Sequence, residues 1–560
     1  MATSPKQSYY KLFAISTIVI FALLLIRVGY IVFAGNPSRK IYQDPKVAST
    51  VVRGTIYDRN GKILAIQTPY YGLYFHLNEI DDLQKAAELV APFVGMNPDQ
   101  VQLQASHYTT YAQIKRKIDP DKVEPLQQVI QRAGLSRELS VVKEMGRTYP
   151  AQFHAAQTIG FTDNENKGLE GIEYTQEQYL DPFPELGNEE VTYGQDITLT
   201  LDIDIQYLLD LQMQSIADVH NPDYAMGIIL DAKNGDILAL SSYPWYNTNE
   251  VNHSNDEERL NHAVNYLYEP GSVFKIFSLA AVMQVGQADL LTPFQCDGSY
   301  TFDSGNGKMV TINCTEPHGT VNPRTMIQKS CNGAIATWAM ETNSQDFYEL
   351  LNKFGFNQAY DINLPSKSKG SIQDPSKWSG RSEATISFGQ ELSSTALHLA
   401  TAATVFTNKG ELLAPHLILS RSVGNATGKL GKVLYERERT VQRQVVSESV
   451  ASKLLSYMQS ATEKGGTAIN TAVDGILVGA KTGTAQILNN ETNSYSDGTV
   501  LASTMAIVPA DDPKYIIYIA AGNPKGNTIW GSNIAAPAIG KVIKALVSQG
   551  KLTSSKSVQL

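Results

Sequence analysis

The chain has few cysteines and no cluster of basic residues, and both shortages limit what it can be. Three cysteines in 560 residues are too few for a disulfide scaffold or for a zinc ribbon of the C-x-x-C type. Asp and Glu outnumber Lys and Arg by 55 to 46, so the sequence shows no electrostatic footprint for nucleic acid. Long repeats and low-complexity segments are absent too. The length then predicts a folded protein of two to four domains, at about 150 residues per domain.

One long hydrophobic run is present, and it lies close to the N-terminus. Residues 12–33 contain a single charge, Arg27, and a helix that crosses a bilayer needs about 20 such residues. A secretory signal would have a shorter apolar core. The run therefore predicts one membrane helix after a short tail, 1–11. The basic residues on its two sides do not decide its orientation.

Two Asn-Gly pairs stand between runs of β-prone residues, which is a strong hairpin signal. The hairpins are predicted at 53–65 and 228–239. Residues 80–140 have helical patterning, and alternation at 196–204 predicts a half-buried strand with which a new domain begins. Near the C-terminus, three strands and a closing helix are predicted at 476–488, 500–508, 515–521 and 534–547.

The motif with the clearest chemical content is an S-x-x-K at 272–275, just after a Pro-Gly pair. If these residues begin a helix, the Ser272 hydroxyl and the Lys275 amine lie on one face. Residues 273–283 are otherwise apolar except for Ser278, so the helix is expected to be buried. A buried lysine has a lowered pKa and can take the proton of a serine nucleophile. Alone, the motif is more often a capping serine followed by a lysine that reaches solvent.

Two further motifs follow at larger spacings. They are an S-x-N from Ser330 to Asn332 and a K-T-G-T from Lys481 to Thr484, the latter on a predicted strand. Each is common in turns, caps or strands when taken alone. In this order, the three motifs together resemble the signature of serine β-lactamases and penicillin-binding proteins.

The residue types of the three motifs suit acyl transfer from an amide through a serine ester. Lys481 would add a second cation to the cleft, which helps to keep Lys275 neutral. Asn332 would hold Lys275 and a substrate amide together. Ser330 would pass a proton toward the leaving amine.

The remaining motif residues are predicted to bind substrate. Gly483 leaves room for a close approach beside the nucleophile, because a glycine inside a strand often marks such a contact. The backbone N–H groups of Ser272 and Thr484 are candidates for an oxyanion hole. The hydroxyls of Thr482 and Thr484 would bind a substrate carboxylate.

Over nearly its whole length the chain resembles a class B penicillin-binding protein, a monofunctional peptidoglycan D,D-transpeptidase. Besides the membrane run and the three motifs, the resemblance rests on four segments, 53–61, 147–150, 168–173 and 533–539. Glu269 resembles the FtsI-like division branch, since the elongation branch more often has proline there. Two positions depart from the family pattern: Ala480 stands where glycine is more frequent, and His262 stands where arginine is usual.

The resemblance implies an α+β fold with a simple order of parts. A cytoplasmic tail and one membrane helix precede an elongated pedestal (dimerisation-like) domain and a transpeptidase domain, in which helices sandwich an antiparallel sheet. The expected bounds are 1–11 for the tail, 12–33 for the helix, 45–194 for the pedestal, 195–548 for the transpeptidase and 549–560 for a C-terminal tail.

The resemblance also implies a place and a substrate class. The catalytic domain is expected outside the bacterial cytoplasmic membrane, acting on stem peptides that end in D-Ala-D-Ala, in septal cell-wall synthesis. β-Lactams are expected to inhibit it covalently. Neither a metal nor an organic cofactor is implied. Expected partners are nascent glycan strands, an FtsW-like membrane glycosyltransferase and other division proteins.

Three rival interpretations are less favoured. A bifunctional class A enzyme would need a glycosyltransferase domain, and 38–194 shows no glutamate motif of that kind. A β-lactamase would add a base that activates deacylating water, and it rarely carries an anchor and a pedestal. A non-catalytic scaffold or β-lactam sensor is disfavoured because all three motifs are intact.

The cysteines lie close to the second motif. Cys296 and Cys314 bracket a polar, glycine-rich stretch without an obvious core, and a disulfide between them is the favoured prediction. Two free thiols are one alternative. A zinc site with His318 is the other, although it lacks a third cysteine or a fourth ligand at a fixed spacing. Cys331, in the middle of the S-x-N, is predicted to be a free, buried thiol.

Overall fold

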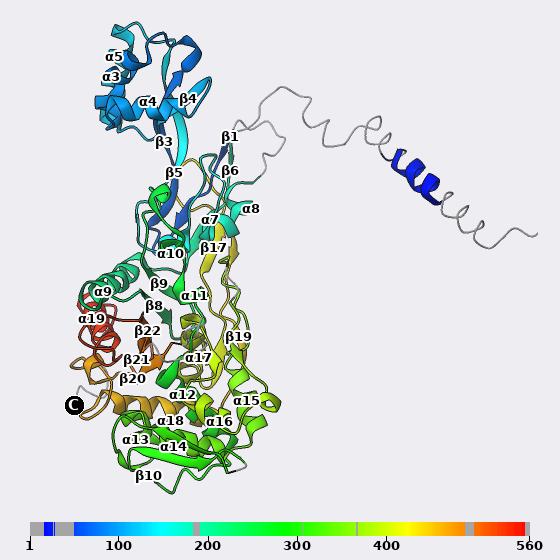
Figure 1. Cartoon of the computed structure of the whole chain (residues 1–560), viewed down its shortest axis with the longest axis vertical. Helices are drawn as coiled ribbons and strands as arrows, with labels where there is room; N and C mark the ends of the chain where they lie inside the picture. The colour runs from blue at the N-terminus through cyan, green and yellow to red at the C-terminus, as the bar shows by residue number, and fades with distance from the viewer. Residues whose placement is uncertain are drawn as a thin grey trace, which may run out of the picture.

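A computed structural model of the chain shows an elongated molecule with a small head at one end (Figure 1). The predicted membrane helix, 12–33, lies largely outside the residues that the structure describes. Residues 16–25 and 27 are helical, and within the described part of the chain no helix is long and apolar enough to cross a membrane. The described residues are 16–25, 27, 50–182, 191–305, 307–365, 368–487 and 498–554.

The head packs three helices against three strands. Its helices bury alanine, valine and leucine side chains in an apolar cluster of their own. Residues 80–140 are helical as predicted, except for the short strand β4. The elements are β3 (Ile63–His76), β4 (Tyr111–Lys115), β5 (Leu139–Thr148), α3 (Leu83–Val94), α4 (Pro98–Ser106) and α5 (Pro120–Arg132).

The hairpin predicted at 53–65 is confirmed, and it belongs to a seven-stranded sheet. Strand β2 (Ile56–Tyr57) pairs antiparallel with β3 and parallel with β7 (Asp196–Leu199). Strand β7 in turn pairs with β17 (Ile418–Ser422), so the sheet crosses the boundary predicted at residue 194. The half-buried strand predicted at 196–204 is shorter, and all four residues of β7 are buried, with Ile197 and Leu199 in an apolar cluster.

The catalytic half is built on a second sheet, five-stranded and antiparallel throughout. Its order is β20-β21-β22-β8-β9, and the hairpin predicted at 228–239 forms β8 and β9. All nine residues of β21 are buried, because helices cover both faces of the sheet. The strands are β8 (Tyr224–Asp231), β9 (Ile237–Tyr243), β20 (Gly479–Gln486), β21 (Val500–Val508) and β22 (Tyr515–Gly522).

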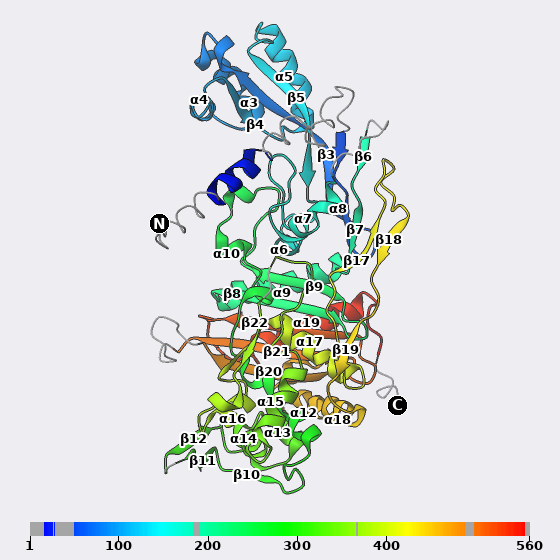
Figure 2. The ribbon, with the colours of Figure 1, turned by 90° about the vertical axis from the view of Figure 1, so that its right-hand side faces the viewer.

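Helices form a layer on each side of this sheet. Helices α9 (Ile203–His220) and α19 (Ala535–Ser548) lie together on one side (Figures 1 and 2). Helices α12 (Lys275–Val285), α17 (Ala396–Thr407) and α18 (Glu448–Gln459) lie on the other. Each side has its own apolar cluster. The predicted α+β fold with an antiparallel sheet between helices is confirmed.

Shorter elements surround these two sheets. Two strand pairs lie at the end of the molecule opposite the head (Figure 2): β10 (Phe294–Cys296) with β13 (Gly319–Val321), and β11 (Ser299–Asp303) with β12 (Met309–Asn313). The other helices are α6 (Ala156–Ile159), α7 (Gly171–Thr175), α8 (Glu177–Leu180), α10 (Asp256–Arg259), α11 (His262–Asn265), α13 (Pro323–Lys329), α14 (Asn332–Met340), α15 (Ser344–Lys353) and α16 (Ser382–Ser387). The other strands are β1 (Thr50–Val52), β6 (Val191–Tyr193), β14 (Ser371–Ile372), β15 (Leu392–Ser393), β16 (Glu411–Leu413), β18 (Val433–Glu436) and β19 (Val441–Gln444).

A buried ion-pair cluster ties three of the family-like segments together below the head. Glu173 accepts hydrogen bonds from Arg53 Nε at 2.7 Å and from Arg147 Nε at 2.6 Å, and all three side chains are about 1% exposed or less. Arg53 also pairs with the partly exposed Glu177 at 2.8 Å. The buried carboxylate of Glu173 therefore joins Arg53, which follows β1, to Arg147 on β5.

We expect Glu173→Gln to destabilise the full-length protein by about 3–5 kcal/mol, because it removes the buried carboxylate that pairs with Arg147 and leaves Arg53 with only the partly exposed Glu177. Glu177→Gln is the matched control and should cost about 1 kcal/mol or less, since that carboxylate is 30% exposed. Denaturant unfolding of both variants measures the difference. Equal, small losses would show that the cluster adds little to stability.

Candidate active site

The S-x-x-K motif lies where a turn passes into a buried helix. Residues Gly271–Phe274 form a 3₁₀ turn, η3, and Lys275 is the first residue of α12. The prediction that Ser272 sits at the start of the helix needs a correction. Ser272 lies inside the turn and makes no side-chain cap there, because the 3₁₀ turn itself leads the chain into the helix. The predicted burial of α12 is confirmed, and Lys275 is fully buried.

The amine of Lys275 is held by the S-x-N motif. Its Nζ donates to the Ser330 carbonyl oxygen at 2.6 Å, to Ser330 Oγ at 3.0 Å and to Asn332 Oδ1 at 2.5 Å. Asn332 Nδ2 donates to the backbone oxygen of Asn313 at 2.8 Å. Both the oxygen and the nitrogen of the Asn332 amide therefore have hydrogen-bond partners, and the S-x-N motif fixes the position of the Lys275 amine.

Lys481 reaches the same serine from strand β20. Its Nζ donates to Ser330 Oγ at 2.8 Å and to the Thr482 carbonyl oxygen at 2.8 Å. Like Lys275, it is fully buried. The hydroxyl of Ser330 thus lies between the two amines, and residues more than 200 positions apart in the chain meet at one point.

Burial changes the pKa of both amines. It lowers the pKa of Lys275 to about 8, although the charges of Cys331 and Cys314 partly oppose the shift. Burial and then the charge of Lys275 lower the pKa of Lys481 well below its ordinary value. Two amines that share one acceptor disfavour each other's protonation, so a neutral amine is accessible near neutral pH.

The edge of strand β20 packs against η3, the turn that contains Ser272. A Cβ atom added at Gly483 would lie 2.8 Å from Val273 Cγ2 and 2.7 Å from Ser503 Oγ, so a side chain does not fit there. Because β20 is the edge strand of its sheet, some of its N–H groups point away from β21 toward η3.

The threonines of the K-T-G-T segment already have polar neighbours. Thr482 Oγ1 donates to Thr467 Oγ1 at 2.8 Å, and Thr484 Oγ1 accepts from the Gly531 N–H at 3.2 Å. Thr467, Gly531 and Asn313 were missed by sequence reasoning, since each is a single residue outside any recognisable motif. Near Gly531, only the segment 533–539 was identified from the sequence.

The predicted site residues do come together, with one qualification on hydrogen bonding. Ser330 and Asn332 contact the buried lysines, and both are partly exposed, as are Ser272 and Thr484. Among the described residues, the structure records no hydrogen bond between the Ser272 and Lys275 side chains. Catalytic hydrogen bonds are often long before substrate binds, and they tighten in the complex.

Cys331 is a free, buried thiol as predicted, whereas Cys296 and Cys314 differ from the favoured prediction. They are free, so the favoured disulfide between Cys296 and Cys314 is absent from the structure. Their sulfur atoms are 3.7 Å apart, and Cys314 Sγ is also 3.7 Å from Cys331 Sγ. Cys331 is buried but not isolated, because the S-x-N turn brings it back beside the loop that carries Cys314. The missing third cysteine of the zinc alternative is therefore present.

The two departures from the family pattern lie in packed surroundings. His262 is buried, stacks on Tyr224 at 4.8 Å and hydrogen bonds to Ser242 and Glu257. Burial lowers the pKa of His262. Ala480 is fully buried in the apolar cluster beneath α19.

Comparison with known families matches this geometry. The model of the penicillin binding protein transpeptidase domain matches residues 225–544, which is more than half of the chain. The model of the penicillin-binding protein dimerisation domain matches residues 48–192. The fold and the three motifs thus define a serine enzyme of the penicillin-binding class. The chain belongs to the class B penicillin-binding proteins, and it is a peptidoglycan D,D-transpeptidase.

Individual relatives cover most of the chain at low identity. The probable peptidoglycan D,D-transpeptidase PenA of Neisseria meningitidis is 28% identical over 573 residues, with 97% of this chain and 92% of PenA covered. The probable peptidoglycan D,D-transpeptidase FtsI of Caulobacter vibrioides is 27% identical, with coverages of 88% and 80%. The structure of penicillin binding protein 3 from Mycobacterium tuberculosis, complexed with ampicillin, has a TM-score of 0.71 and 23% identity, with coverages of 91% and 97%.

Proposed function

We propose that this transpeptidase cross-links stem peptides ending in D-Ala-D-Ala through an ester of Ser272, in septal wall synthesis. The observation that carries the catalytic part is the network in which Lys275 and Lys481 share the hydroxyl of Ser330. A nucleophile, two buried amines and an amide within one small volume suit acyl transfer from an amide.

Each motif residue has a distinct proposed role. Lys275 takes the proton of Ser272, and Ser330 relays a proton to the leaving amine. Asn332 positions Lys275. The N–H groups of Ser272 and Thr484 bind the oxyanion.

The substrate carboxylate is proposed to bind along β20. Lys481, Thr482 and Thr484 offer an amine and two hydroxyls there, and Gly483 lets the strand lie close to η3. An anion beside Lys481 would raise the pKa of that amine, and the charge so gained would keep Lys275 neutral. Substrate binding would thus prepare the base.

The setting of the enzyme is also a proposal. A membrane helix at 12–33 would hold the chain to the bacterial cytoplasmic membrane with its catalytic domain outside, above a pedestal at 45–194. The transpeptidase domain is proposed to span 195–548. Residues 38–194 show no glutamate motif of a glycosyltransferase. The enzyme would therefore depend on an FtsW-like membrane glycosyltransferase and on other division proteins. The septal role is supported by Glu269 and by the similarity to a protein named FtsI.

We expect Lys481→Ala to weaken acylation by carboxylate-bearing ligands more than by a neutral ester of the same ligand. The Lys481 amine can make a charge-assisted hydrogen bond with the carboxylate of the acid but not with the neutral ester, and such bonds contribute about 1.5–3 kcal/mol. The ratio of acylation rates for the two ligands, in variant and wild type, measures the effect. Equal losses for acid and ester would mean that Lys481 acts on the chemical step instead.

Depletion of the protein in its native host tests the septal role. We expect filaments with failed septa, because the chain would no longer cross-link septal peptidoglycan. Microscopy of depleted cells, with a wild-type copy as rescue and a Ser272→Ala copy as the inactive control, makes the comparison. Rounded or swollen cells would assign the enzyme to elongation.

A further inference from the structure

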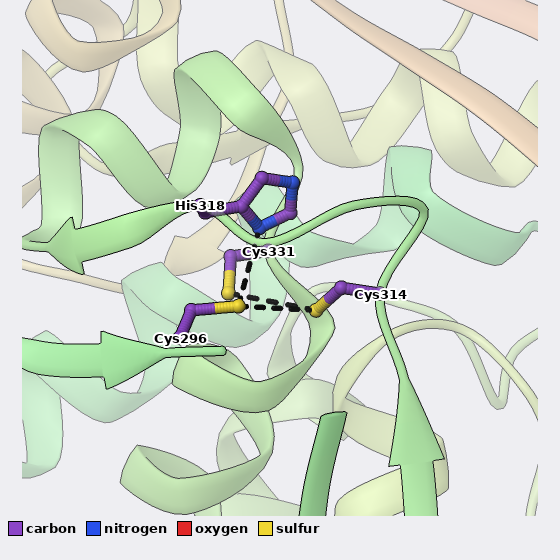
Figure 3. Close-up of side chains that lie close together, drawn as sticks. All are labelled: Cys296, Cys314, His318 and Cys331. Atoms are coloured by element: carbon purple, nitrogen blue, oxygen red, sulfur yellow. Dashed lines mark hydrogen bonds between the residues drawn. The ribbon is translucent and has the colours of Figure 1, made fainter. Parts of the chain in front are cut away.

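Four side chains that can bind a metal meet directly beside the S-x-N motif (Figure 3). One ligand atom from each of Cys296, Cys314, His318 and Cys331 lies within 4.8 Å of the others. They come from the end of β10, the residue after β12, the residue before β13 and the N-cap of α14. Segments that are separate in the sequence therefore converge on one point.

Three of the six distances between these atoms match the edges of a tetrahedral zinc site, and the other three are within 4.8 Å. Zn–S bonds of about 2.3 Å and a Zn–N bond of about 2.05 Å give tetrahedron edges of about 3.8 Å between sulfurs and about 3.6 Å from sulfur to nitrogen. The structure has 3.7 Å for Cys296 to Cys314, 3.7 Å for Cys314 to Cys331 and 3.5 Å from Cys296 Sγ to His318 Nδ1. A disulfide needs about 2.05 Å.

The ligand set and its burial favour a structural metal. Three thiolates and an imidazole are soft ligands that suit zinc and exclude magnesium and calcium. Cys296, His318 and Cys331 are each at most 5% exposed, and only Cys314 is partly accessible. With four protein ligands no coordination position is left for a substrate, as in other closed zinc sites.

Backbone contacts hold the ligands in register. The His318 N–H donates to the Cys296 carbonyl oxygen at 3.1 Å, and the Cys314 N–H donates to the Gly298 carbonyl oxygen at 2.9 Å. The strands that carry these ligands form only two-stranded sheets. Such small elements bury little apolar surface, and a metal is a common way to stabilise them.

The residues next to two of the metal-binding cysteines take part in the hydrogen-bond network around Lys275. Cys331 lies between Ser330 and Asn332, whose atoms accept all three hydrogen bonds of the Lys275 amine. Asn332 donates to Asn313, which precedes Cys314. Ser330 has a φ of 60°, an uncommon backbone conformation for a non-glycine residue that its surroundings must hold in place.

We propose that Cys296, Cys314, His318 and Cys331 bind one structural Zn²⁺ ion, which fastens the S-x-N turn in the position that Lys275 requires. The four ligands are positioning residues, because none contacts the reacting atoms. The effect on catalysis rests on the proposed roles of Lys275, Ser330 and Asn332, whereas binding of the metal does not.

Metal analysis of the full-length protein tests the site. Protein purified in detergent under reducing conditions should contain one zinc ion per chain by elemental mass spectrometry. His318→Ala should lose the zinc, whereas His318→Cys, which supplies a fourth thiolate, should keep it. His220→Gln is the control histidine outside the cluster and should keep it as well. Replacement by Co²⁺ should give the visible absorption of a tetrahedral cobalt thiolate.

Acylation by labelled penicillin tests the coupling. Loss of zinc in His318→Ala, or its removal by a chelator, should slow acylation about 10²-fold, because a displacement near 1 Å can cost that much. Added Zn²⁺ should restore the rate in chelated wild type, and His318→Cys should react at nearly the normal rate. Unchanged acylation after complete zinc loss would overturn the positioning role.

Two results would overturn the site itself. Zinc-free protein with a single alkylatable thiol when denatured without reduction would mean a disulfide, and zinc-free protein with three reactive thiols would mean unliganded cysteines. Failure of the proposed catalytic roles looks different. The protein would then contain zinc, and removing the zinc would lower its stability without slowing acylation. Lys275 variants would also be acylated at the normal rate.

Discussion

We expect Ser272→Ala to abolish labelling of the protein by penicillin and to leave its fold intact. The change removes one oxygen atom from a partly exposed turn, so it opens no cavity and leaves no buried polar group without a partner. Without that hydroxyl, the proposed ester of Ser272 cannot form. Gel fluorescence after incubation with a labelled penicillin, together with thermal unfolding, measures both expectations.

Ser278→Ala is the matched control, since Ser278 lies on the next turn of α12 and its buried hydroxyl has no hydrogen-bond partner within the described residues. This variant should label like the wild type. Mass spectrometry of the wild-type adduct should place it on Ser272, and an adduct on any other serine would refute the assignment. The wild-type adduct should also persist, whereas rapid hydrolysis would indicate a β-lactamase.

Lys275→Arg should slow acylation by about 10²–10⁴-fold, which is the usual contribution of a general base. A guanidinium stays protonated at every relevant pH, so it cannot take the proton of Ser272. Stopped-flow acylation rates measure the loss. Lys453→Arg, an exposed position on α18, is the control for the substitution itself. A variant that retains more than about a hundredth of the rate would contradict the base role.

The pH profile of the wild type gives an independent check of that role. Burial lowers the pKa of Lys275 to about 8, and only the neutral amine can act as a base. The acylation rate should therefore fall about tenfold per pH unit well below 8 and level off above it. Because Lys481 shares Ser330 with Lys275, the apparent pKa belongs to the pair. A rate independent of pH between 6 and 9 would exclude an amine base.

Contacts between distant segments were beyond the reach of sequence reasoning, as Glu173 illustrates. Its segment was recognised from the resemblance, yet its pairing with Arg53, 120 residues away, follows from how the strands below the head are arranged. Strand β7 is similar. Its alternating pattern predicted one exposed face, but all four of its residues are buried, because other parts of the fold cover both faces of the sheet there.

The cysteines show the same limit at the active site. Cys296 and Cys314 were paired because they bracket one loop, and Cys331 was assigned only to its own motif. The left-handed backbone of Ser330 turns the chain so that Cys331 faces Cys314. No spacing rule predicts that turn, since three unrelated loops contribute to the cluster.

The sequence by itself determined the motifs, both hairpins, the C-terminal strands and the buried helix of Lys275, because each depends on residues that are neighbours along the chain. The tertiary structure alone decided which groups meet: Ser330 between two amines, Asn332 on the Asn313 carbonyl, and three cysteines with one histidine. Those contacts join loops and strands that only packing of the sheet and helices brings together, and the pKa of Lys275 depends on that burial.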